Sequence, residues 1–145
     1  MSDLEIVRHF KADADKVFAF VTQTEHVLKW WGPEGLTVPE RDMDFTSPGP
    51  WTSTMVNADG DRFKVSGEVL SVDPPRSVNF TWGWHDDQDR RGHESRVRFD
   101  VASNPDGGCT FTLTHSGLPD DEEAARHTSG WESSLRKLER MDETT

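Results

Sequence analysis

Residues 120–141, DDEEAARHTSGWESSLRKLERM, carry the strongest helix signal in the chain. Apolar and weakly polar side chains recur every three or four residues, which is the spacing of one face of an α-helix. This stripe consists of Ala124, His127, Trp131, Leu135, Leu138 and Met141. The acidic residues at 120–123 favour a helix N-terminus because they complement the helix dipole. The pattern predicts an amphipathic helix of about 20 residues, about 30 Å long, that buries its stripe against another layer.

The middle of the chain alternates with a period of two, as half-buried strands do. In residues 77–84, for example, Val78, Phe80, Trp82 and Trp84 alternate with smaller and more polar side chains. Gly- and Pro-rich turns such as ADGD at 58–61 and NPDGG at 104–108 separate the segments and favour antiparallel hairpins. We therefore predict about six antiparallel strands, at residues 36–44, 51–57, 62–73, 77–84, 94–103 and from 109 onward.

A further strand and two short helices are predicted before these strands. Residues 4–10 alternate, Asp13 can cap a first helix, and Thr24 can cap a second short helix through Lys29, which Pro33 cannot continue. Gly32 or Gly35 can take the positive φ of the following turn. The resulting order predicts an α+β fold, a curved antiparallel sheet wrapped around a long C-terminal α-helix. The length of 145 residues suits one domain over residues 1–145.

Charge and cysteine content exclude several classes of function. The chain has 27 Asp+Glu against 16 Lys+Arg, a net charge of -11, which opposes binding to nucleic acid and to anionic membranes. Cys109 is the only cysteine, so neither an internal disulfide nor a multi-cysteine metal site can form. The sequence contains neither a signal-peptide pattern nor an apolar run long enough to span a membrane. We expect a cytoplasmic protein.

Four segments carry a resemblance to a known family. They are KWWGPEG at 29–35, GEVLSVDPPR at 67–76, Thr81-Trp82, and GWESSL at 130–135 with Leu138; the run TLTHSGL at 112–118 is also family-like. In this order the chain resembles, from about residue 4 to 141, the START-like (SRPBCC) superfamily with the helix-grip (Bet v 1-like) fold. Within it the chain is most similar to the C-terminal domain of the activator of Hsp90 ATPase (AHSA1). The resemblance implies a cavity between sheet and C-terminal helix, with the Trp30-Trp31 segment beside its entrance.

The candidate ligand-binding residues are those that alternation, stripe or resemblance directs toward that space. Each large side chain among them can instead be ordinary core, so the choice between a packed interior and an open cavity stays open here. The candidates are Trp30, Trp31, Met55, Phe63, Val69, Phe80, Trp82, Phe99, Phe111, Leu113, His115, His127, Trp131 and Leu135.

Polar candidates are few. His115 and His127 are each either a buried neutral imidazole or a polar anchor or general base within the cavity, and no carboxylate partner can be assigned to them. The acidic loop at 85–94 indicates a solvated hairpin tip rather than a metal site, and Cys109 is interpreted as a small buried side chain. Phosphate-binding loops, a nucleophile elbow and paired catalytic carboxylates are missing from the sequence.

The sequence therefore predicts a binding protein for a small hydrophobic or aromatic ligand, with no metal or cofactor, acting as a monomer or homodimer. Two alternatives remain open at this point. One is a cavity-type enzyme, cyclase- or hydrolase-like, and the other is an Hsp90-type chaperone-interaction module.

Overall fold

The computed structural model describes residues 1–143, so the last two positions of the expected domain lie outside the described residues. The elements follow the expected order of strand, two short helices, six strands and a long helix. They are β1 (Ser2–Phe10), α1 (Ala14–Thr22), α2 (Thr24–Trp30), β2 (Thr37–Asp42), β3 (Gly49–Val56), β4 (Arg62–Asp73), β5 (Ser77–His85), β6 (Arg91–Ser103), β7 (Cys109–Leu118) and α3 (Asp121–Glu143).

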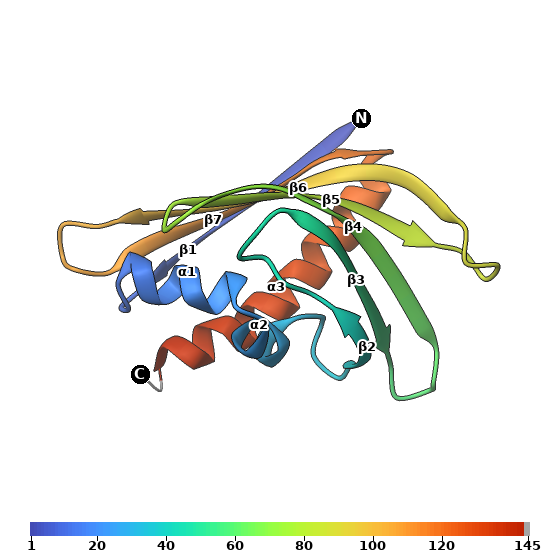
Figure 1. Ribbon diagram of the computed structural model, residues 1–145, viewed down its shortest axis with the longest axis horizontal. Coiled ribbons are helices and arrows are strands. Elements are labelled where there is room, and N and C mark those ends of the chain that lie inside the picture. The colour runs from blue at the N-terminus through green and yellow to red at the C-terminus, as the bar shows by residue number, and fades with distance from the viewer. Residues whose placement is uncertain (144–145) are drawn as a thin grey trace.

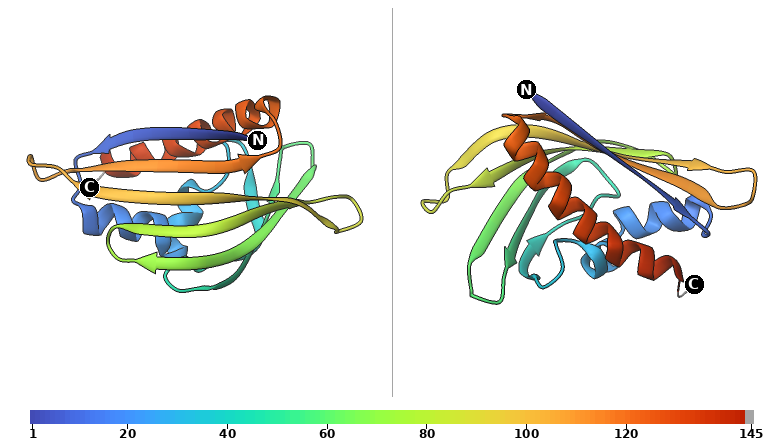
Figure 2. Two further views of the ribbon diagram at one scale, coloured as in Figure 1. Left: turned by 90° about the horizontal axis from the view of Figure 1, so that it is seen from above. Right: turned by 180° about the vertical axis from the view of Figure 1, so that it is seen from behind.

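The strands form one seven-stranded antiparallel sheet in the order β1-β7-β6-β5-β4-β3-β2. The sheet is strongly curved, and all three helices lie on its concave side (Figure 1). Helix α3 runs diagonally across that side, as the view from behind in Figure 2 shows. Among residues 1–143, none of the helices is both long enough and apolar enough to cross a membrane. The architecture predicted from the order of elements is confirmed.

The two short helices differ in how they begin. Asp13 caps α1 as predicted, because its side chain accepts a hydrogen bond of 2.9 Å from the backbone N–H of Lys16. The prediction that Thr24 caps α2 is wrong. Helix α2 already includes Thr24, and Gln23 occupies the cap position without a side-chain hydrogen bond. The hydroxyl of Thr24 donates instead to the carbonyl of Met43, which ties α2 to the segment between β2 and β3.

The hairpin between β5 and β6 is tighter than its polar sequence indicated. His85 pairs with Arg91 across the ladder, so both residues lie in strands, whereas the sequence predicts a loop there. The turn closes because Asp86 accepts hydrogen bonds of 2.9 Å from the backbone N–H groups of Gln88 and Arg90. Asp89 takes a left-handed φ of 61° at its tip. Local side-chain to backbone hydrogen bonds let the strands extend into an acidic segment.

Aromatic side chains fill most of the space between sheet and helices. The ring of Trp31 lies 5.7–5.9 Å from five other rings, those of Trp30, Phe45, Trp51, Trp82 and Trp131. The three innermost indole N–H groups are satisfied: Trp30 donates to the Phe20 carbonyl, Trp31 to the Ser53 hydroxyl and Trp51 to the Thr81 carbonyl. Large rings therefore make up a substantial part of the core in a chain with only 32% hydrophobic residues.

The apolar stripe of α3 faces this core with two changes from the expectation. His127, Trp131, Leu135 and Leu138 are buried, whereas Ala124 and Met141 are only half-buried. Two polar side chains that the stripe omitted are also buried, Ser134 and Asp142. The carboxylate of Asp142 accepts hydrogen bonds of 2.9 Å from the backbone N–H groups of Lys11 and Ala12, and so joins the end of α3 to the turn between β1 and α1.

Candidate functional site

A pocket of about 330 Å³ remains open where the N-terminal half of α3 faces the sheet. Its walls come from three places: strands β3 to β5, the loop that follows α2, and α3. The lining residues are Trp31, Gly32, Pro33, Met55, Phe63, Trp82, Trp84, Glu123, Arg126, His127, Gly130, Trp131 and Ser134. The lining is mainly apolar and aromatic, with its polar groups gathered on α3, as is common in small-molecule sites.

The sequence-predicted ligand-binding residues divide into two groups in the structure. The members that line the pocket are Trp31, Met55, Phe63, Trp82, His127 and Trp131. The others are packed in the interior, each at most 1% exposed, and do not line it: Trp30, Val69, Phe80, Phe99, Phe111, Leu113, His115 and Leu135. Alternation shows which side chains of a strand point inward, but it does not distinguish those that are packed in the core from those that line a pocket. Only the packing of the rings separates filled space from open space.

Four indoles form the aromatic part of the pocket. Trp31, Trp82 and Trp131 lie with ring centroids 5.3–5.8 Å apart and make the inner wall. Trp84 stands 5.4 Å from Trp82 in an edge-to-face arrangement, and Phe63, 41% exposed, lies at the outer side. The indole nitrogen of Trp82 is buried and has no hydrogen-bond partner within residues 1–143. That nitrogen is therefore not exposed at the surface of the pocket.

The loop after α2 forms one wall and is anchored to α3. Gly32 and Gly35 both have positive φ, 84° and 89°, which confirms the predicted turn geometry. The backbone N–H of Glu34 donates to the Ser133 hydroxyl at 2.8 Å, and the Glu34 carboxylate pairs with Arg140. These contacts hold Gly32 and Pro33 against the pocket.

His115 lies deeper than the pocket, between β6 and α3. Its Nδ1 accepts a hydrogen bond of 3.1 Å from the indole N–H of Trp131, and its Nε2 lies 2.7 Å from the Ser95 hydroxyl. An indole N–H only donates, so Nδ1 carries no proton and the neutral ring holds its proton on Nε2. Burial, with a smaller contribution from His127, lowers the pKa of His115 to about 3. His115 therefore corresponds to the buried neutral imidazole that the sequence left as one of two alternatives.

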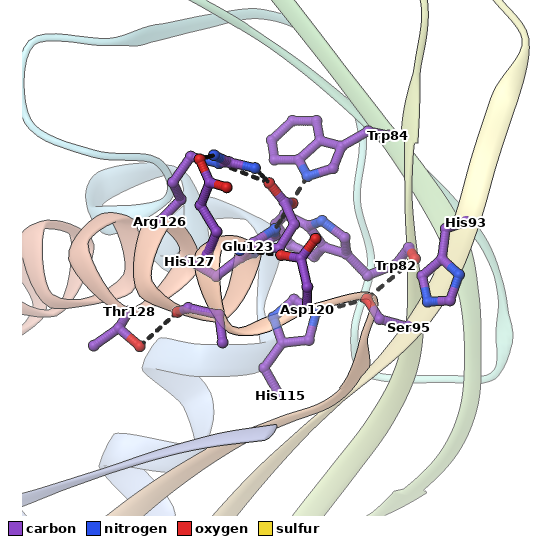
Figure 3. Close-up of polar contacts among 12 residues, drawn as sticks. Trp82, Trp84, His93, Ser95, His115, Asp120, Glu123, Arg126, His127 and Thr128 are labelled. Carbon is purple, nitrogen blue, oxygen red and sulfur yellow. Dashed lines mark hydrogen bonds and ion pairs between the residues drawn. The ribbon is translucent and has the colours of Figure 1, made fainter. Parts of the chain in front are cut away.

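His127 occupies the pocket wall itself and has two competing partners. Its Nε2 lies 3.2 Å from the indole nitrogen of Trp84 and 3.2 Å from Glu123 Oε2 (Figure 3). When Nε2 is unprotonated it accepts from Trp84 but sets its lone pair against the carboxylate. When Nε2 is protonated it donates to Glu123 and leaves the Trp84 N–H without an acceptor. Burial lowers the pKa of His127, Glu123 opposes that shift, and Arg126 adds to it.

Glu123 and Arg126 form the charged rim of the pocket. The Arg126 guanidinium donates to Glu123 Oε1 through Nε at 2.7 Å and also through Nη2, and to Glu122 Oε1 through Nη1 at 3.1 Å. Glu123 is the carboxylate partner of His127 that sequence reasoning did not assign. The signal was present in the i,i+4 spacing of Glu123 and His127, which places both side chains on one helix face.

The remaining lining residues were missed for different reasons. Trp84 shares the strand face of Phe80 and Trp82 but is not among the candidates that the sequence predicts. Arg126, Gly130 and Ser134 lie beside the apolar stripe, and Gly32 and Pro33 were interpreted as turn residues. Their positions in the pocket follow from how α3 and the loop meet, which no local pattern encodes.

Two other polar candidates fall outside the pocket. In the β5–β6 hairpin, His85 Nδ1 lies 2.9 Å from Asp89, whose carboxylate also pairs with Lys64. Within residues 1–143, no three His, Cys, Asp or Glu side chains gather in a way that could hold a metal ion. Cys109 is buried, and burial raises the pKa of its thiol to about 11, so at neutral pH it is protonated and a weak nucleophile.

A curved seven-stranded antiparallel sheet wrapped around one long C-terminal helix, with two short helices after the first strand, is the helix-grip fold of START-like proteins. The sequence profile described as Activator of Hsp90 ATPase homolog 1-like protein matches residues 11–143. The chain belongs to this AHSA1 family. No curated protein matches the chain.

Solved structures support both the fold and the family. A crystal structure of the AHSA1 protein from Silicibacter pomeroyi is 53% identical, with a TM-score of 0.92 over 97% of this chain and 96% of that one. A protein from Chromobacterium violaceum is 19% identical with a TM-score of 0.84 over 99% of both chains. One from Mycobacterium smegmatis is 20% identical with a TM-score of 0.79 over 96% of this chain and 89% of that one. The last two likenesses show the shared fold.

Proposed function

We propose that this protein binds a small hydrophobic or aromatic molecule in the pocket between the sheet and the N-terminal half of α3. The observation that carries the proposal is the open pocket of about 330 Å³ walled by four indoles. The pocket is concave and mainly apolar and aromatic, with a few polar groups at one side, and this is the usual character of a small-molecule site.

The apolar wall and the polar rim divide the work of binding. Rings such as Trp31 and Trp131 offer flat apolar surface to a ligand, and their removal from water on binding supplies affinity. The polar groups of α3 at the rim would orient the molecule. This division of roles supports the binding of one small molecule in the pocket over the docking of a macromolecule on its surface.

Tryptophan fluorescence tests the proposal directly, because four of the six tryptophans line the pocket. Titration with small aromatic molecules should give saturable changes in emission. Gly130 supplies a matched pair of variants, since a Cβ at this position would meet Pro33 Cγ at 3.8 Å, an ordinary contact. Gly130→Leu should fill the pocket and abolish binding, whereas Gly130→Ala should keep it. Equal binding by both variants, or a flat response across a diverse set, would reject the proposal.

One observation favours catalysis as a second candidate. A histidine that contacts a carboxylate at the wall of a pocket is the arrangement of a general base with its orienting group, and Glu123 and His127 are 3.2 Å apart. A screen of small aryl esters for hydrolysis tests this candidate. It requires turnover that His127→Gln abolishes while the fold, measured by circular dichroism, is unchanged.

A further inference from the structure

We propose that the pocket selects apolar or aromatic molecules that carry a protonated amine, and that Glu123 is the residue that binds the ammonium group. This inference rests on the proposed function and names the class of ligand. Three observations carry it. His127 has two competing hydrogen-bond partners, Arg126 is already bonded to carboxylates, and aromatic walls surround Glu123, the only carboxylate among the lining residues.

The first observation is that one ring nitrogen at the polar end of the pocket faces two groups that it cannot serve together. The Trp84 N–H and Glu123 Oε2 both lie 3.2 Å from His127 Nε2, which serves only one of them at a time. Burial favours the neutral form of His127. If Nε2 accepts from Trp84, Glu123 Oε2 has no side-chain donor on that side among residues 1–143, and a ligand N–H would supply one. The ligand would then complete the set of hydrogen bonds without displacing either residue.

The second observation is that the one cation of the lining is already engaged. All three nitrogens of the Arg126 guanidinium donate to carboxylates, two to Glu123 and one to Glu122. These three bonds leave two of the five guanidinium N–H groups, but a carboxylate ligand bound there would stand beside Glu122 and Glu123 at the acidic start of α3, residues 120–123. Anionic ligands are therefore disfavoured even though an arginine lines the pocket.

The third observation is the aromatic character of the walls around Glu123. The faces of indole rings carry partial negative charge and attract cations, most strongly when the cation is partly removed from water. Four indoles and Phe63 line the same pocket as the carboxylate. The net charge of -11 adds a long-range attraction for cations. An ammonium group on an apolar body fits both parts of this site.

Three matched probes test the inference at neutral pH by calorimetry: 2-phenylethylamine, 2-phenylethanol and 3-phenylpropionate. They share a phenyl ring and short chain and differ in charge. The amine should bind about tenfold more tightly than the alcohol, the gain of one charge-assisted hydrogen bond, and the acid should bind most weakly. Glu123→Gln should remove the advantage of the amine over the alcohol and strengthen binding of the acid, because the charge-assisted hydrogen bond is lost and Arg126 loses a partner.

Glu122→Gln is the matched control. It removes the same charge from the other carboxylate partner of Arg126, but its side chain is 80% exposed and does not line the pocket. It should leave the preference for the amine in place. The inference is overturned if the acid binds as well as the amine, or if the preference for the amine survives in Glu123→Gln. In either case, binding of the alcohol would still support the proposed function. If none of the three probes binds, the proposed function fails and this inference with it.

Discussion

The indole N–H of Trp131 on α3 donates a hydrogen bond of 3.1 Å to Nδ1 of His115 on β7. This bond joins the long helix to the centre of the sheet and determines which nitrogen of the imidazole holds the proton. Ser95 on β6 completes the connection at 2.7 Å from Nε2. Both ring nitrogens of His115 are therefore paired, whereas Nε2 of His127 at the pocket wall has two competing partners.

The first prediction concerns stability in acid. The pKa of His115 is about 3 in the folded protein against an ordinary value of 6.5. Between these two pH values His115 is protonated in the unfolded chain but not in the folded protein. The free energy of unfolding therefore decreases as the pH falls from 6.5 toward 3. This loss is at most about 1.4 kcal/mol per pH unit.

His115→Gln tests this prediction, because the amide oxygen can accept from Trp131 and the amide nitrogen can donate to Ser95. The variant should be less stable at neutral pH by about 1–2 kcal/mol but should lose less stability on acidification. Urea unfolding at pH 7 and pH 5 measures both quantities. Parallel pH dependences in the variant and the wild type would contradict the prediction.

The second prediction concerns the pH dependence of amine binding. Protonation of His127 would let its Nε2 donate to Glu123 and compete with an ammonium ligand. The groups that face His127 are Glu123 and Arg126 on α3, Trp84 on β5, and His115 on β7, whose ring centroid is 4.7 Å away. His115 stays neutral down to about pH 3, so the competing proton belongs to His127.

Affinity for 2-phenylethylamine should thus hold below pH 6.5 and fall only as the pH drops through the lowered pKa of His127. Affinity for 2-phenylethanol should change much less. Calorimetric titration across this range measures the difference, and His127→Gln should shift or remove the decline. An unchanged decline in that variant would assign the proton to another group.

The third prediction concerns Asp142, which lies one residue beyond the helix end expected from the sequence. Its carboxylate accepts from the N–H groups of Lys11 and Ala12 and is 6% exposed. Asp142→Ala should lower the free energy of unfolding by about 1–3 kcal/mol because two backbone donors lose their acceptor. Thermal unfolding of this variant beside Glu143→Ala, an exposed neighbour, gives the comparison. Equal effects would show that the contact does not stabilise the fold.

The fourth prediction concerns Gly130, which lies inside α3 rather than at its end. Glycine in a helix interior costs about 1 kcal/mol relative to alanine. Since a Cβ here meets nothing closer than 3.8 Å, Gly130→Ala should raise stability by about 0.5–1 kcal/mol. Chemical denaturation measures the change. A loss of stability would mean that the loop at Gly32 and Pro33 shifts to accommodate the methyl group.

The fold could be predicted from the sequence because its strands, helices and turns each follow from short-range patterns. The alternation of Phe80 and Trp82 in β5, the spacing of Trp131 and Leu135 in α3, and the turns around Gly32 and Gly60 each depend on neighbours within a few residues. Order and period then leave few ways to bury the apolar faces. The cap at Thr24 failed because the hydroxyl found a partner distant in sequence, the carbonyl of Met43.

The sequence predicts which side chains point into the interior, but it does not predict which of them line the pocket. The sequence indicates that Phe99 and Trp82 both point inward, but one is packed solid and the other borders open space. That difference depends on the angle at which α3 crosses the sheet and on how rings from distant segments fill the gap. Likewise His115 and His127 appear equivalent in the sequence. Tertiary packing seals His115 between Ser95 and Trp131 and leaves His127 at the rim with Glu123, since side-chain burial and hydrogen bonding across elements are properties of the assembled core.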